Sequence, residues 1–66
     1  MKMRPVSPFV ARIIDEIEEE INRKGDGTDE NSREIAREYM KIHALSFLER
    51  ETVKSVLLED LGLVDI

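Results

Sequence analysis

Apolar residues recur at intervals of three and four along the first third of the chain, and this spacing constrains the fold more than any other feature of the sequence. It places them on one side of an α-helix, whose period is 3.6 residues. They are Val10, Ile13, Ile14, Ile17 and Ile21. Ser7 suits the N-cap, Pro8 suits the first helical position, and Gly25 suits a left-handed position just past the end. We therefore expect a helix over residues 8–24.

Two further helices are expected after a polar loop at residues 25–31. Apolar residues at helical spacing predict the second helix over residues 30–45. Ser46 and Glu49 match the S-x-x-E capping box, in which each side chain accepts a hydrogen bond from the other residue's backbone N–H. A third helix is therefore expected over residues 47–61. The alternative is one long helix through Ser46, because neither Gly nor Pro interrupts the segment.

Three amphipathic helices joined by short loops indicate an all-α fold, a small three-helix bundle in a single domain over residues 1–66. The core of so short a chain is small, and natural chains of this size often add disulfides, a metal or a partner. The chain has no cysteine, and His43 is its only histidine, so neither disulfides nor a zinc site is expected. Association, most simply as a symmetric homodimer, remains as a way to complete the bundle.

The formal net charge of −5 argues against general affinity for nucleic acid or for anionic membranes, which needs an excess of Lys and Arg. No apolar run approaches the roughly 20 residues that span a bilayer, so a cytoplasmic location is expected. Charged residues make up 38% of the chain, with ten Glu and no Gln. This bias is typical of proteins from thermophiles, and it bears on stability rather than on activity.

Catalysis is not expected from this sequence. Ser46, His43 and Asp60 supply the residue types of a catalytic triad, but these types occur in almost any chain. Glu16, Glu19 and Glu20 fall on the outer side of the first helix among Arg and Lys, which indicates a solvated surface rather than a metal cluster or an acid–base pair. A bundle of this size also offers little concavity for a small-molecule substrate. We therefore expect no enzymatic activity, no cofactor and no metal.

Residues 32–37, Ser-Arg-Glu-Ile-Ala-Arg, resemble the second helix of helix-turn-helix domains, where a small residue packs against the following helix. The resemblance implies DNA binding, with Arg33, Arg37 and Lys41 meeting phosphates from one side of that helix. The sequence departs from that family because residues 39–42 continue the helix where a glycine-containing turn is usual. The third helix also carries more acidic than basic side chains.

The carboxyl-terminal end holds more apolar residues than one side of a helix can bury. A bundle takes an apolar stripe of roughly 100° from each helix, and the remainder is expected to form an exposed patch typical of an interface. The residues expected to bind a partner are Leu57, Leu61, Leu63, Val64 and Ile66. The alternative is that the last residues fold back and cap the open end of the bundle.

Together these features predict a small acidic protein–protein interaction module, acting as a regulatory, adaptor or inhibitor protein. It would bury the apolar carboxyl-terminal surface against a partner protein, with the acidic side of the first helix providing charge complementarity. A minimal helix-turn-helix DNA-binding regulator is the alternative function.

Overall fold

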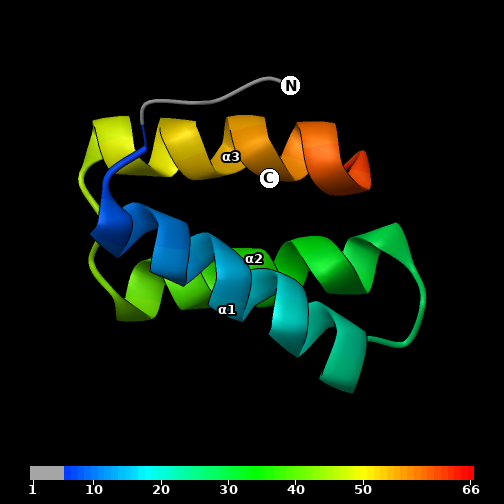
Figure 1. Cartoon of the computed structure of the whole chain (residues 1–66). Coiled ribbons are helices and arrows are strands. Elements are labelled where there is room, and N and C mark those ends of the chain that lie inside the picture. The colour runs from blue at the N-terminus through cyan, green and yellow to red at the C-terminus, as the bar shows by residue number, and fades with distance from the viewer. Residues whose placement is uncertain (1–5) are drawn as a thin grey trace.

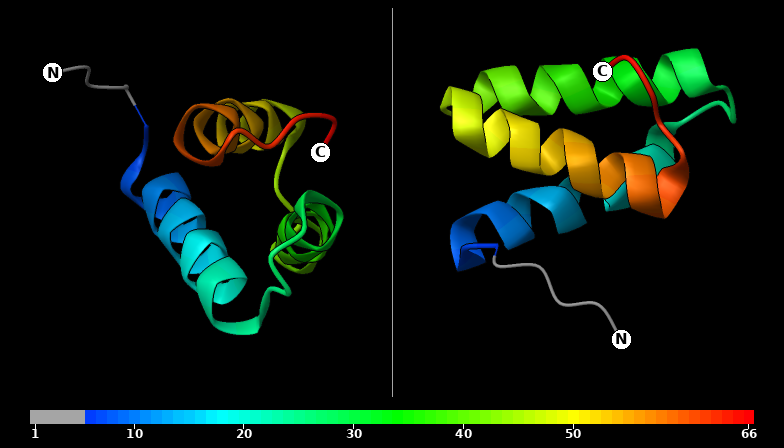
Figure 2. Two further views of the ribbon diagram at one scale, coloured as in Figure 1. Left: turned by 90° about the vertical axis from the view of Figure 1, so that its right-hand side faces the viewer. Right: turned by 90° about the horizontal axis from the view of Figure 1, so that it is seen from above.

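The structure, a computed structural model, describes residues 6–66 and contains three helices in that range. Helix α1 spans Pro8–Lys24, α2 spans Asp29–Ile42, and α3 spans Phe47–Leu61. Helix α1 packs against both α2 and α3, and α2 and α3 run antiparallel (Figures 1 and 2). The predicted all-α three-helix bundle is confirmed, and the alternative of one long helix through Ser46 is wrong.

One hydrophobic core joins the three helices. Most of the apolar stripe predicted on the first helix is buried, while Ile21 at its end is only partly buried. The segments after α2 and after α3 also contribute, through Leu45 and Leu63. The core consists of Val10, Ile13, Ile14, Ile17, Ala36, Met40, Leu45, Val53, Val56, Leu57 and Leu63.

Local signals place the start and end of α1. The Ser7 hydroxyl oxygen accepts a hydrogen bond from the Val10 N–H at 3.2 Å, which confirms the predicted N-cap. Gly25, however, has φ −66° and ψ 151°, so the predicted left-handed conformation is wrong. Its N–H donates to the Ile21 carbonyl at 2.9 Å, and a Cβ at this position would lie 2.3 Å from that same oxygen. A close approach between backbone atoms therefore accounts for this glycine.

Helix α2 ends three residues earlier than predicted. The Ala44 N–H donates to the Lys41 carbonyl at 3.1 Å, and the Leu45 N–H donates to the Met40 carbonyl at 3.4 Å. These two bonds form a Schellman motif, in which the residue after the C-cap adopts a left-handed conformation. Ala44 has φ 51°, and Leu45 and Met40 are both buried. Burial of Leu45 therefore accompanies a left-handed turn at a residue that is not glycine.

Helix α3 begins and ends as the sequence predicts. The Ser46 hydroxyl accepts from the Glu49 N–H at 3.2 Å, and the Glu49 carboxylate accepts from the Ser46 N–H at 2.8 Å. At the other end Gly62 has φ 71°, and its N–H donates to the Leu58 carbonyl at 2.9 Å. This left-handed glycine reverses the chain direction.

The residues after α3 cross the gap between α3 and α2 on the side away from α1 (Figure 2). Leu63 is buried, and the half-buried Ile66 packs against the core. Arg37 Nη2, from the middle of α2, donates to the Asp65 backbone carbonyl at 2.8 Å. The segment thus folds back, as the alternative prediction described, and joins α3 to α2.

Candidate interaction surface

Exposed large apolar side chains are concentrated between residues 42 and 64. Within residues 6–66, seven large apolar side chains are 42–75% exposed, and only Phe9 belongs to α1. The other six belong to the end of α2, to α3, or to the segment directly after α3. They are Ile42, Phe47, Leu48, Leu58, Leu61 and Val64. The apolar surface therefore includes the predicted carboxyl-terminal end but extends along the whole of α3.

Helix α3 differs from α1 and α2 in carrying apolar residues on two sides. The side that includes Val53 and Leu57 is buried. Phe47, Leu58 and Leu61 lie within a narrow stripe on another, exposed side, because each residue turns the helix by about 100°. Apolar side chains outside the buried side thus leave an exposed apolar stripe on α3.

The predicted partner-binding residues fall into two groups. Leu57 is 0% exposed and Leu63 is 3% exposed, so both belong to the core of the single chain rather than to its surface. Leu57 lies on the side of α3 that meets α1, and the reversal at Gly62 turns Leu63 inward. Leu61 and Val64 are exposed, and Ile66 is half-buried.

A concavity of about 550 Å³ lies between the carboxyl-terminal half of α2 and the amino-terminal half of α3, and we call it the basic groove. Its lining combines apolar and charged side chains: Met40, Ala44, Leu45, Phe47 and Ile66 with Arg37, Lys41, Arg50, Glu51 and Lys54. Four of the five charged residues are cations, although the chain as a whole is acidic. The groove is therefore positively charged, whereas the net charge of the chain is negative.

Two of these cations have partners within the chain. Lys54 Nζ lies 3.2 Å from the Glu51 carboxylate, and Arg37 donates to the Asp65 carbonyl. Lys41 on α2 and Arg50 on α3 take part in no ion pair within residues 6–66. Their charges are therefore available to an external anion, one on each wall of the groove.

The residues predicted to contact DNA are only partly brought together. Arg37 and Lys41 line the basic groove, whereas Arg33, one turn earlier on α2, does not. The antiparallel course of α2 and α3 also differs from a helix-turn-helix unit, whose helices meet at roughly 90–120° (Figures 1 and 2). Arg37 and Lys41 therefore face a groove with helical walls, although all three residues keep the predicted spacing of four along one side of α2.

A second concavity of about 500 Å³ continues along α3 and shares Glu51, Lys54 and Ile66 with the basic groove. It adds the exposed apolar side chains of Leu58 and Val64. The two concavities and the exposed stripe that holds Phe47, Leu58 and Leu61 thus form one extended surface, whereas Leu48 lies outside it. We call this surface, defined by Phe47, Arg50, Lys54, Leu58, Leu61 and Val64, the α3 face.

Sequence reasoning missed Phe47, Arg50, Lys54 and Leu58. The spacing of seven and four from Phe47 through Lys54 to Leu58 marks one side of a helix and would have revealed the stripe. Its proximity to Lys41 on α2 follows only from the antiparallel packing, which the spacing does not show.

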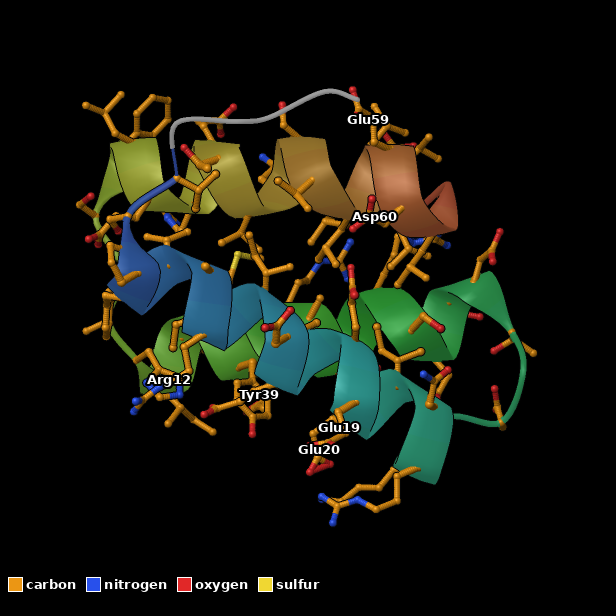
Figure 3. The ribbon with its side chains drawn as sticks, in the orientation of Figure 1. Arg12, Glu19, Glu20, Tyr39, Glu59 and Asp60 are labelled. Atoms are coloured by element: carbon orange, nitrogen blue, oxygen red, sulfur yellow. The ribbon has the colours of Figure 1, made fainter. Side chains whose placement is uncertain are left out.

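Carboxyl groups meet on the opposite side of α3, where it packs on α1. Burial raises the pKa of Glu18 to about 7, and a hydrogen bond to Asp60 together with the charges of Asp60 and Asp15 acts in the same direction. Asp60 lies on the side of α3 nearer to α1 (Figure 3). Within residues 6–66 no group of three or more His, Cys, Asp or Glu side chains is arranged to hold a metal ion.

The predicted acidic side of α1 is partly neutralised within the chain. Glu19 and Glu20 lie on the side of α1 away from α3 (Figure 3). Burial by itself raises the pKa of Glu20, but pairing with Arg23 and with Lys24, at 3.4 Å, outweighs it and holds the pKa below its usual range. Glu20 is buried, so its predicted solvated position is wrong, and cations of its own helix balance its charge while its Oε1 accepts no hydrogen bond within residues 6–66.

His43 makes contacts that suit a structural role. Its ring stacks on that of Tyr39, with the ring centroids 5.4 Å apart, and its Nε2 lies 3.9 Å from a Glu16 carboxylate oxygen. The ring stack lies within α2 and its C-cap, and the contact with Glu16, an ion pair when His43 is protonated, reaches α1.

In the part of the chain that the structure describes, no helix is both long and apolar enough to cross a membrane. No protein-family model, curated protein or solved structure matches the chain.

Proposed function

We propose that the chain is a protein-interaction module that binds a partner protein through the α3 face. The observation that carries this proposal is the concentration of exposed large apolar side chains on α3 and the segments beside it. Contiguous apolar patches of this kind on soluble proteins mark interaction sites. Such a module would regulate, inhibit or recruit the protein that it binds.

The dimensions of the chain suit this role. A standard protein–protein interface buries about 800 Å² on each partner. That area is about a sixth of the 4798 Å² of accessible surface of the chain. Exposed Phe47, Leu58 and Leu61 provide the large apolar anchors on which interface affinity usually depends. Their burial would also supplement a small core.

Charge and geometry favour a protein over DNA as the partner. The net charge of −5 opposes the neutralisation of many phosphates, and the exposed residues of α3 include the carboxylates Glu51, Glu59 and Asp60. Recognition of duplex DNA by a helix instead needs side chains that donate to or accept from base edges in the major groove. A second copy of the chain is one form that the partner protein can take.

Site-specific photo-cross-linking tests the proposal in cells that naturally make the chain. A benzophenone amino acid replaces Phe47 or Leu58 on the α3 face, and Glu19 on α1 in a matched control chain. We expect covalent protein adducts of defined mass from positions 47 and 58 and none from position 19. An adduct of twice the chain's mass identifies a homodimer, which is also a protein partner.

The proposal fails if the three positions give equal yields or give no protein adduct. It also fails if duplex DNA binds the purified chain tightly and competes for positions 47 and 58. Leu58→Ser provides an independent check, because Leu58 is 49% exposed and its replacement leaves the core intact. This variant is expected to remain folded, with a free energy of unfolding lowered by about 1 kcal/mol, and to lose the adduct formed from position 47.

A further inference from the structure

The basic groove has two helical walls and an apolar floor. Antiparallel α2 and α3 form the walls, and α1 packs behind both of them (Figure 2). Met40 and Leu45 lie at the base as buried core residues, and Phe47 stands at the rim, 65% exposed. Residues 63–66 cross one part of the gap between α2 and α3, and the part towards the turn at residues 43–46 is open to a further helix, as in a four-helix bundle.

The cations of the groove stand on both sides of this floor. Lys41 is on the α2 wall and Arg50 is on the α3 wall, and neither forms an ion pair within residues 6–66. Lys54 and Arg37 add positive charge farther along, although each already has a partner. A complementary ligand therefore presents an apolar stripe to the floor and a negative charge to each wall.

An amphipathic helix with Asp or Glu on both sides of an apolar stripe has this chemistry. We propose that the basic groove binds such an acidic amphipathic helix of a partner protein. The inference rests on the proposed function and specifies the class of partner. About two turns of the helix lie against α2 and α3 between the turn at residues 43–46 and Ile66, and the rest of the helix extends past that turn.

The same charges could attract a nucleic acid, but the lining of the groove favours a peptide. Five of its ten residues are apolar, and Glu51 stands among the cations. An apolar floor matches the aliphatic side chains of a helix, whereas a phosphate backbone would leave that floor uncovered by apolar atoms. Binding of a nucleic acid in the groove is therefore tested in the same experiment and is expected not to occur.

A displayed library of amphipathic helices of about 15 residues, a length at which isolated helices begin to form, tests the inference against the full chain. Every member carries the same apolar stripe, and the residues beside the stripe vary among Glu, Lys and Gln. We expect selection to enrich Glu on both sides of the stripe. The best peptide, labelled with a fluorophore, then reports affinity by anisotropy at low and high salt.

Charge reversal in the groove is compared with charge reversal elsewhere. The groove variant carries two substitutions, Lys41→Glu and Arg50→Glu, one on each wall. The control variant carries Arg12→Glu and Arg33→Glu, because neither of these residues lines the groove. Each pair changes the formal net charge from −5 to −9, since each reversal removes one positive charge and adds one negative. We expect at least about tenfold weaker peptide binding for the groove pair and less than about threefold for the control.

Several results overturn the inference. They are enrichment of Lys beside the stripe, absence of any charge preference, equal weakening by the two pairs, and preferential binding of single-stranded or duplex nucleic acid. If one of them occurs while position 47 or 58 still cross-links to a protein, the protein-interaction function stands and only the acidic helix is rejected. If the peptide binds as expected but no adduct forms in cells, the groove has the inferred chemistry and the proposed function fails.

Discussion

Arg37 Nη2 donates a hydrogen bond to the backbone carbonyl of Asp65 at 2.8 Å, and this bond ties the middle of α2 to the segment that follows α3. The two residues are 28 positions apart in the sequence. The bond is exposed to solvent, whereas Leu63 in the same segment is buried. It therefore supplements the apolar contacts that hold this segment in place.

Replacing Arg37 by Ala is expected to loosen the segment after α3 without unfolding the helices. An exposed hydrogen bond of this kind contributes about 0.5–1.5 kcal/mol, so the free energy of unfolding should fall by no more than that. Faster exchange of the Leu63 amide hydrogen, whose N–H donates to the Leu57 carbonyl, measures the local effect. Arg33→Ala is the control, and equal exchange rates in both variants would show that the Asp65 bond has no such role.

Replacing Ala44 by Gly is expected to stabilise the protein. Ala44 has φ 51°, a left-handed conformation that costs a residue with a Cβ about 1 kcal/mol more than glycine. The greater flexibility of glycine in the unfolded chain offsets part of this gain, so we expect a net increase of about 0.5 kcal/mol in chemical denaturation. Ala11→Gly, within α1, should instead destabilise by about 0.5–1 kcal/mol. A loss of stability in Ala44→Gly would contradict the turn described for residues 43–46.

Adjacent leucines of α3 are expected to respond differently to the same substitution. Leu57 is 0% exposed and Leu58 is 49% exposed. Leu57→Ala should lower the free energy of unfolding by about 2–5 kcal/mol, because it leaves a cavity in a small core. Leu58→Ala should lower it by less than about 1 kcal/mol. Denaturation of the two variants side by side measures the difference, and similar losses would show that the buried side of α3 is assigned wrongly.

The Glu18–Asp60 pair predicts that stability falls as pH rises through the neutral range. The folded chain raises the pKa of Glu18 from 4.5 to about 7, mainly through burial, so the folded state holds a proton that the unfolded state has released. The resulting stabilisation is fully present below pH 4.5 and is lost as pH rises to about 7. Because solvent screens this carboxyl group, we expect a loss of about 1 kcal/mol.

Glu18→Gln should remove this pH dependence and exceed the parent chain in stability at pH values above the raised pKa. Urea denaturation at several pH values between 4.5 and 8 provides the measurement. Glu19→Gln, at the exposed neighbouring position, controls for the change in net charge. An unchanged pH profile in Glu18→Gln would mean that Glu18 ionises in the folded chain as it does in the unfolded chain.

The bounds of α1 and α3 could be predicted because their signals are local. Ser7, Ser46 and Gly62 act through hydrogen bonds to residues three or four positions away. The end of α2 could not be predicted in the same way. Its left-handed residue is Ala44, which carries no glycine signal, and the turn depends on burying Leu45 in a core that includes α1 and α3.

The candidate site was predictable only in part, for a related reason. An apolar excess near the end of α3 was visible in the sequence, but which of its leucines face inward depends on where α1 packs. Leu57 and Leu58 are the same residue type, and they differ only in the side of α3 on which their side chains lie. Lys41 and Arg50 face one groove because α2 and α3 are antiparallel, and the spacing of residues within either helix does not contain that information.

The segment after α3 gives α2 and α3 a second mechanical connection. The turn at residues 43–46 links the two helices at one end. The Arg37–Asp65 hydrogen bond links them towards the other end through the segment after α3. Because the Arg37–Asp65 bond is exposed, its opening would let the segment after α3 move and the width of the groove vary at that end.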